Sequence, residues 1–210
     1  MKKIFIDLEM PPVPRLALAS GRALNGEVIE IGAVALDEQD REIGRFDAYV
    51  RPARAASLPE NIVQLTGIRT EQVLQAAPFE TVFSAFLSWC GSDCTFYAWS
   101  DSDRRQLQCE CEAKGLAGAA DRFSWQDFQK IFSRQFDFER RMSLERAVTL
   151  AGLDFEGRAH GALTDAANTA ALYLQTKKSS FRKLVNTVRG DHARMSVSLG
   201  SLFDFAALAV

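Results

Sequence analysis

The sequence of 210 residues predicts an α/β fold, in which a mixed β-sheet with an antiparallel and a parallel part is covered by helices. Three strand-like runs lie close together in the first 50 residues, which favours an antiparallel meander. From residue 59 onward, helical and strand-like patterns alternate, as is typical of parallel strands connected through helices. No internal repeat or long linker is visible, so the length fits one domain with a tail.

The first run, residues 2–8, alternates and is rich in isoleucine and phenylalanine, and three prolines at 11, 12 and 14 end it. Residues 15–26 predict an irregular loop. Residues 28–36 and 45–50 predict the second and third strands, separated by a polar turn. Further strands are expected at 95–99 and near 123. Helices are expected at residues 59–65, 78–89, 103–113, near 132, after Ser143 to 151, and 164–177.

Composition excludes several classes of protein. No stretch approaches the roughly 18 apolar residues that span a bilayer, and no secretory signal is visible, so we expect a cytoplasmic protein without a membrane partner. The formal net charge of −2 argues against binding nucleic acid mainly through bulk positive charge. Bound metal ions can still reverse the local charge of an active site.

Four cysteines form C-x3-C and C-x-C pairs, at Cys90, Cys94, Cys109 and Cys111. Neither spacing matches the commoner zinc-ligand patterns, and no histidine lies nearby. We therefore interpret them as buried free thiols, with structural zinc as the alternative.

Asp7 and Glu9 are two residues apart on the first strand, so their side chains share one face while Ile6 and Leu8 point the other way. Two carboxylates at the end of an apolar strand are costly unless a positive charge neutralises them, and a divalent cation does so. The alternative is a strand that runs out into solvent.

Two further places carry acidic residues at expected helix starts. Asp101 and Asp103 follow the strand that ends near residue 99, and Asp165 follows His160 in a glycine-flanked loop. Each acid can be read as a helix N-cap. An imidazole that titrates near neutral pH, however, suits a general base that takes a proton from water.

Taken together, four carboxylates and a histidine fit a two-metal phosphoryl-transfer site. Hard oxygen ligands select Mg²⁺ or Mn²⁺ over zinc. The pattern therefore predicts Asp7, Glu9, Asp165 and one of Asp101 and Asp103 as metal ligands, with His160 as the base.

At this point the sequence resembles a known family, the DEDDh 3′–5′ exonucleases of the ribonuclease H-like superfamily. The three motifs are residues 5–9 (FIDLE), 99–107 (WSDSDRRQL, close to W-G-x-x-D-x-x-x-L) and 160–165 (HGALTD). Residues 27–34 (EVIEIGAV) and 65–68 (LTGI) also fit the family pattern. The spacing is most similar to the KapD-like and histone-mRNA exonuclease branch, whose members trim RNA 3′ ends.

The resemblance implies a ribonuclease H-like five-stranded mixed sheet, two Mg²⁺ or Mn²⁺ ions, and release of nucleoside 5′-monophosphates from single-stranded 3′ ends, RNA being favoured over DNA. It implies that Asp103 is a ligand and Asp101 is not, and that Asp7 bridges the two ions. Substrate-binding residues are then expected at Leu8, Met10, Leu65, Thr66, Ile68, Trp99 and Asn168.

The chain departs from the family pattern at two positions. Ser100 stands where glycine is frequent, and Thr164 replaces a common acid, but all five catalytic positions are filled. Two alternatives remain open: a DNA-directed exonuclease of the proofreading or repair type, and a nucleic-acid-binding module that has lost catalysis.

We expect an exonuclease domain at residues 1–178 and a basic and apolar extension at residues 179–210. Basic residues gather from 177 to 194, and residues 195–210 are largely apolar. One interpretation is a final helix and strand that pack on the domain. The other is a basic segment that contacts the substrate backbone, followed by an apolar segment that forms a homodimer.

Overall fold

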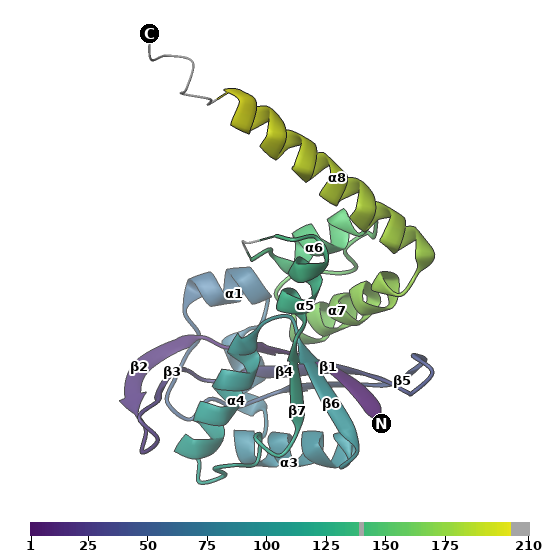
Figure 1. The fold of residues 1–210 in the computed structure, drawn as a ribbon. Coiled ribbons are helices and arrows are strands. Elements are labelled where there is room, and N and C mark those ends of the chain that lie inside the picture. The colour runs from purple at the N-terminus through teal and green to yellow at the C-terminus, as the bar shows by residue number, and fades with distance from the viewer. Residues whose placement is uncertain (139–140, 203–210) are drawn as a thin grey trace.

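The computed structural model describes the backbone of residues 1–138 and 141–202 and the side chains as far as residue 190. Its main sheet has five strands in the order β5-β4-β1-β6-β7 (Figure 1). These strands are β1 (Lys2–Glu9), β4 (Glu30–Leu36), β5 (Glu42–Tyr49), β6 (Cys94–Ala98) and β7 (Ser124–Asp127). β1 pairs antiparallel with β4 and parallel with β6. The predicted mixed sheet is confirmed.

Helices cover both faces of this sheet (Figure 1). On one face, Ile4, Ile6 and Leu8 of β1 form a core with the apolar side chains of α3 (Phe79–Cys90) and α4 (Asp101–Ala113). On the other face, Phe5 packs with Ala170 of α7 (Ala162–Thr176). The alternation of β1 therefore distributes its side chains between two helical layers, as its period of two requires.

The expectation of an irregular loop at residues 15–26 is wrong. This segment contributes to a hairpin of β2 (Pro12–Ala17) and β3 (Ala23–Gly26). Two polar contacts attach the hairpin to α4, because Ser20 Oγ donates to Glu112 at 2.6 Å and Arg22 pairs with the same carboxylate at 3.2 Å. Pro12 is the first residue of β2, which lies outside the main sheet, so its missing N–H removes no hydrogen bond from that sheet.

The remaining helices form two smaller groups. α1 (Glu60–Thr66) and α2 (Thr70–Gln75) share a cluster with Ile29; the sequence predicted α1 but missed the six-residue α2. α5 (Phe128–Gln135), α6 (Leu144–Leu150) and the start of α8 (Ser179–Leu202) share an aromatic cluster that includes Phe181. Ser143 caps α6 as predicted, its Oγ accepting from the N–H of Arg146.

The tail continues as helix α8, which leads away from the domain (Figure 1). Its first turns pack on the domain, since Phe181 is buried and three further apolar residues, Leu184, Val185 and Val188, join the same cluster. The strand expected near the end of the chain falls largely on residues 203–210, which lie outside the described residues. No helix in the described part of the chain is long and apolar enough to cross a membrane.

All four cysteines are buried free thiols. Burial raises the pKa of the Cys111 thiol to about 12, and it also raises the pKa of Cys90. Within the described ranges, no three metal-binding side chains that include a cysteine come together. The interpretation as packed thiols fits this environment.

Candidate active site

Asp7 and Glu9 lie at the carboxyl end of β1, where the parallel strands of the sheet also end. Opposite them on β4 lie Gly32 and Glu30, respectively. Glu9 is 9% exposed, so the strand holds an acidic side chain largely out of water. The carboxyl edge of parallel strands is where ligand sites gather in α/β folds.

Asp103 reaches the same edge from the first turn of α4. Ser100, not an aspartate, caps this helix, because its side chain accepts from the N–H of Ser102. Asp103 is 4% exposed, and the backbone N–H of Leu8 in β1 hydrogen-bonds to its carboxylate. The helix thus delivers an acid directly beside the first strand.

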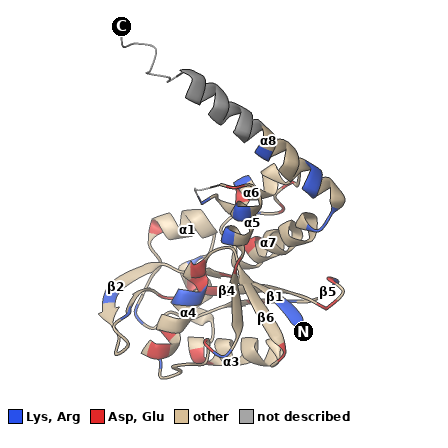
Figure 2. Ribbon diagram, viewed as in Figure 1, with Lys and Arg blue, Asp and Glu red and all other residues tan. Residues whose placement is uncertain are grey.

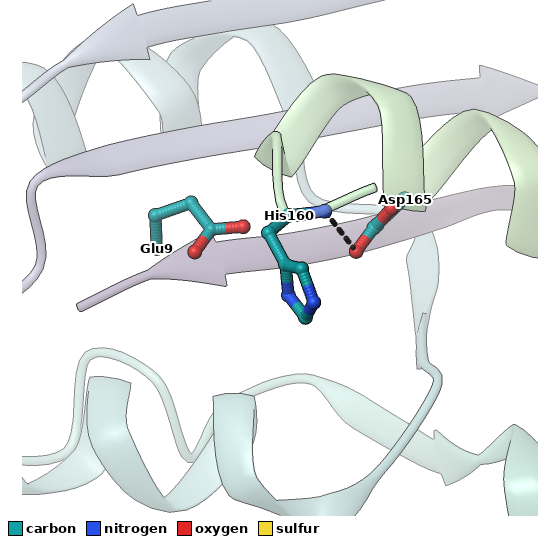
Figure 3. Close-up of side chains that lie close together, drawn as sticks. All are labelled: Glu9, His160 and Asp165. Carbon is teal, nitrogen blue, oxygen red and sulfur yellow. Dashed lines mark hydrogen bonds between the residues drawn. The ribbon is translucent and has the colours of Figure 1, made fainter. Parts of the chain in front are cut away.

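Asp165 reaches the edge from the other layer, in the first turn of α7. The reading of Asp165 as an N-cap is wrong, since the helix begins at Ala162 and Gly161 is its cap. Asp165 Oδ2 accepts a hydrogen bond of 3.3 Å from the backbone N–H of His160 (Figure 3). His160 has φ of 63°, a left-handed conformation, and its exposed imidazole points away from the helix (Figure 3).

Two residues of β4 hold the start of α7, and sequence reasoning gave neither of them a role. Glu30 is 6% exposed and accepts a 2.8 Å hydrogen bond from the N–H of Ala162. At Gly32, an added Cβ would lie 2.0 Å from the backbone nitrogen of Leu163. A buried acid and a glycine inside an apolar strand were the available signals, because glycine in a strand often marks a close backbone approach.

Burial, and for three of the four acids the charges of the others, raise the pKa values at this edge. Burial and the charge of Asp165 raise the pKa of Glu9 to about 8. Burial raises the pKa of Asp103 to about 7 and that of Asp165 to about 6. The pKa of Asp7 lies well above its usual value, because of burial first and then the charges of Asp103, Asp165 and Glu9. Buried acids that lie this close together favour the binding of a cation.

The donor set fits a divalent cation. Ligand atoms of Glu9, His160 and Asp165 lie within 4.8 Å of one another (Figure 3). Asp165 Oδ1 is buried and has no hydrogen-bond partner. Asp7 and Asp103 lie outside this tight group but interact electrostatically with it. Carboxylate oxygens are the ligands that Mg²⁺ and Mn²⁺ prefer.

The predicted substrate residues divide by exposure. Leu65 is 45% exposed at the end of α1, and Met10 is half-buried just beyond β1. Leu8 and Ile68 are buried in apolar clusters. Thr66 is buried as well, and its hydroxyl closes the turn after α1 by donating to the carbonyl of Ile62 and accepting from the N–H of Ile68.

Trp99 and Asn168 use their polar atoms inside the protein. The indole N–H of Trp99 donates to the carbonyl of Met142 at 3.2 Å. The amide of Asn168 accepts from the N–H of Glu156 at 3.0 Å and donates to the carbonyls of Glu156 and Thr164, both at 2.9 Å. Asn168 therefore ties the loop that leads to His160 onto α7.

A sequence profile of the family described as Exonuclease (RNase_T) matches residues 4–173. The chain belongs to this exonuclease family. ERI1 exoribonuclease 2 of Mus musculus is 32% identical over 170 residues, which cover 70% of this chain and 25% of the relative. The chain thus spans about a quarter of the length of that relative.

The fold of this exonuclease domain is shared by solved nucleases. The nuclease domain of 3′hExo, a DEDDh family member solved with rAMP bound, superposes with a TM-score of 0.74 at 22% identity, covering 86% of this chain and 94% of that one. Exonuclease I of E. coli, solved with a dT13 oligonucleotide, superposes with a TM-score of 0.64 at 17% identity, covering 84% of this chain and 41% of that one. The predicted resemblance to DEDDh exonucleases is confirmed.

Proposed function

We propose that this exonuclease domain is a metal-dependent 3′–5′ exonuclease that removes nucleoside 5′-monophosphates from single-stranded RNA ends. The observation that carries the proposal is the convergence of three separate elements, β1, α4 and α7, which bring four acids and His160 to one edge of the sheet. The name of the mouse relative, an exoribonuclease, favours RNA as the substrate.

Two Mg²⁺ or Mn²⁺ ions fit the acids of this edge. In our proposal Asp7, Glu9 and Asp165 would hold one ion, and Asp103 with Asp7 would support the second. When bound, such ions lower the pKa of a water and neutralise charge on the phosphate and the leaving oxygen. The buried Asp165 Oδ1, which has no partner in the protein, supports the assignment of that side chain as a ligand.

His160 serves as the general base in this proposal. Its imidazole is exposed and makes no hydrogen bond to any described residue, so it is free to accept a proton from water. The Asp165 carboxylate accepts a hydrogen bond from the backbone N–H of His160. This contact orients the imidazole without occupying its ring nitrogens.

The substrate-binding residues act in two ways in this proposal. Met10 and Leu65 contact the terminal nucleotide directly, and the buried residues Leu8, Thr66 and Ile68 support the segments that carry them. Trp99 and Asn168 instead position the loops of the site, because their polar atoms are committed to backbone groups.

The test is a time course on 5′-labelled single-stranded RNA and DNA of equal length, with Mg²⁺, Mn²⁺ or EDTA. We expect a metal-dependent ladder that shortens from the 3′ end, faster on RNA. Asp7→Ala should abolish it, while Glu80→Ala, which removes an exposed acid of α3, should not. Robust cleavage by Asp7→Ala would contradict the assignment. Faster cleavage of DNA would favour the DNA-directed alternative, and binding without cleavage would favour a silent module.

The extension at residues 179–210 belongs to the same proposal. We propose a division after residue 178, a cytoplasmic location and a homodimer formed through the apolar end of the extension. Size-exclusion chromatography with light scattering on the full chain and on a chain that ends at residue 194 would test the dimer. Equal, monomeric masses for both would contradict it.

A further inference from the structure

A hollow lies at the carboxyl ends of β6 and β7, the two parallel strands that follow β1 in the sheet. Its volume is about 160 Å³, and its lining comes from β6, α4, β7 and α5, with Ser100, Arg104, Gln126 and Lys130 among the polar residues. This volume is smaller than the roughly 300–1,000 Å³ of ordinary small-molecule pockets, so a small polar group fits it better than a nucleoside does.

Among the described residues, one positive charge of the hollow has no ionic partner. Its two acids are already paired: Asp101 with Arg105 at 2.8 Å, and Asp127 with Lys130 at 3.0 Å. Arg104 has no ion-pair or hydrogen-bond partner among the described residues, and its Nε is buried. A buried Nε without a hydrogen-bond partner is costly, and the planar fork of guanidinium donors suits a phosphate.

The position relates this charge to the reaction. Arg104 follows Asp103 directly on α4, so the hollow and the metal-binding acids share one helix start. Figure 2 shows basic positions on both α4 and α5, the two helices that border the hollow. A strand whose scissile phosphate lies at Asp103 can therefore present another of its phosphates to Arg104.

We propose that this hollow is a phosphate subsite, in which Arg104 binds a phosphodiester of the substrate strand other than the scissile one. The inference rests on the proposed function and extends it by naming a contact to the strand. The subsite holds the strand in register and carries no base specificity, because a phosphate contact reads no sequence.

The kinetic test compares wild type, Arg104→Gln and the control Arg45→Gln, which removes an exposed arginine paired with Glu42 on β5. On a 12-nucleotide single-stranded RNA, Arg104→Gln should raise KM by about 10-fold and leave kcat within about two-fold. The slope of log(kcat/KM) against log[salt] should become shallower by about 0.7, the value for one phosphate contact on a single strand. A lowered kcat with unchanged KM would overturn the inference, because Arg104 would then act through Asp103.

The second test locates the phosphate. RNAs that carry one neutral methylphosphonate at successive positions should show one position whose neutralisation weakens the wild type but not Arg104→Gln. Equal losses in both proteins at every position would overturn the subsite. Arg104→Lys gives the same comparison if the glutamine variant does not fold, with a loss of about three-fold, since lysine lacks the fork.

The two proposals fail separately. Fluorescence anisotropy in Mg²⁺ can measure binding of the same RNA to Asp7→Ala and to the double variant Asp7→Ala/Arg104→Gln. This measurement requires no cleavage. If the wild type does not cleave but binding depends on Arg104, the proposed exonuclease activity is contradicted and the phosphate subsite is supported. If the wild type cleaves but binding does not depend on Arg104, the exonuclease activity is supported and the phosphate subsite is contradicted.

Discussion

Replacing Glu9 by glutamine should stabilise the metal-free protein at alkaline pH while it abolishes cleavage. The folded protein raises the pKa of Glu9 from 4.5 to about 8. Between these values the folded state binds a proton that the unfolded state does not, so stability falls as the pH rises through this window. Glutamine carries no charge at any pH, so the variant escapes this loss.

The difference between a pKa of 4.5 and one of about 8 corresponds to an upper limit of about 5 kcal/mol. We expect a net gain of about 2 kcal/mol, because the buried amide must still find hydrogen-bond partners. For a chain of this length, that gain raises Tm by roughly 4–8 °C at pH 9. At pH 5 the gain should nearly vanish, since Glu9 is then protonated in the folded wild type.

Thermal unfolding followed by circular dichroism, in EDTA at pH 5 and pH 9, measures this effect. Glu42→Gln is the control, because Glu42 is exposed, its pKa is lowered by Arg45, and its removal should give no gain. Mg²⁺ should stabilise the wild type more than Glu9→Gln, since binding to the folded state adds to stability. A variant less stable than the wild type in EDTA at pH 9 would refute the reasoning.

Two further predictions concern the base and the helix contact. His160→Ala should lower kcat by roughly 10²–10⁴-fold on single-stranded RNA with Tm unchanged, and a normal rate would remove His160 as the base. Gly32→Ala should cost more than about 3 kcal/mol in unfolding by denaturant, because its Cβ would overlap the backbone of α7, whereas Gly44→Ala on the next strand meets only a Trp89 side chain at 3.5 Å and should cost far less. Equal stability of the two alanine variants would contradict the close approach.

Local patterns were sufficient to predict the acids and the sheet. The alternation of residues 2–8 placed Asp7 and Glu9 on one face, and the structure keeps them there, on the opposite side from Ile6 and Leu8. The period of a strand is a property of its own backbone, so it can be read without knowing the partner.

Features that depend on distant contacts escaped the sequence. The β2–β3 hairpin is stabilised from outside, by contacts of Ser20 and Arg22 with Glu112 about 90 residues away. Asp165 resembled an N-cap because no polar side chain stands at the true start of α7, where Gly161 precedes Ala162. The N–H of Ala162 in the first turn donates instead to the carboxylate of Glu30, which comes from β4.

Strand β4 and the residues that lead into it contact helices of both layers, α7 on one side and α4 on the other. On the α7 side, Glu30 accepts from the helix start. On the α4 side, the residues leading into β4 are held by buried polar groups: Gln106 donates to the carbonyl of Gly26, and Glu110 accepts from the N–H of Val28, at 2.8 and 2.9 Å. Because β4 contributes no predicted metal ligand, its buried acid and glycine act through geometry. They hold the start of α7, which carries Asp165, while the contacts of Gly26 and Val28 hold α4, which carries Asp103. Burial, and in turn the charge of Asp165, raise the pKa of Asp103.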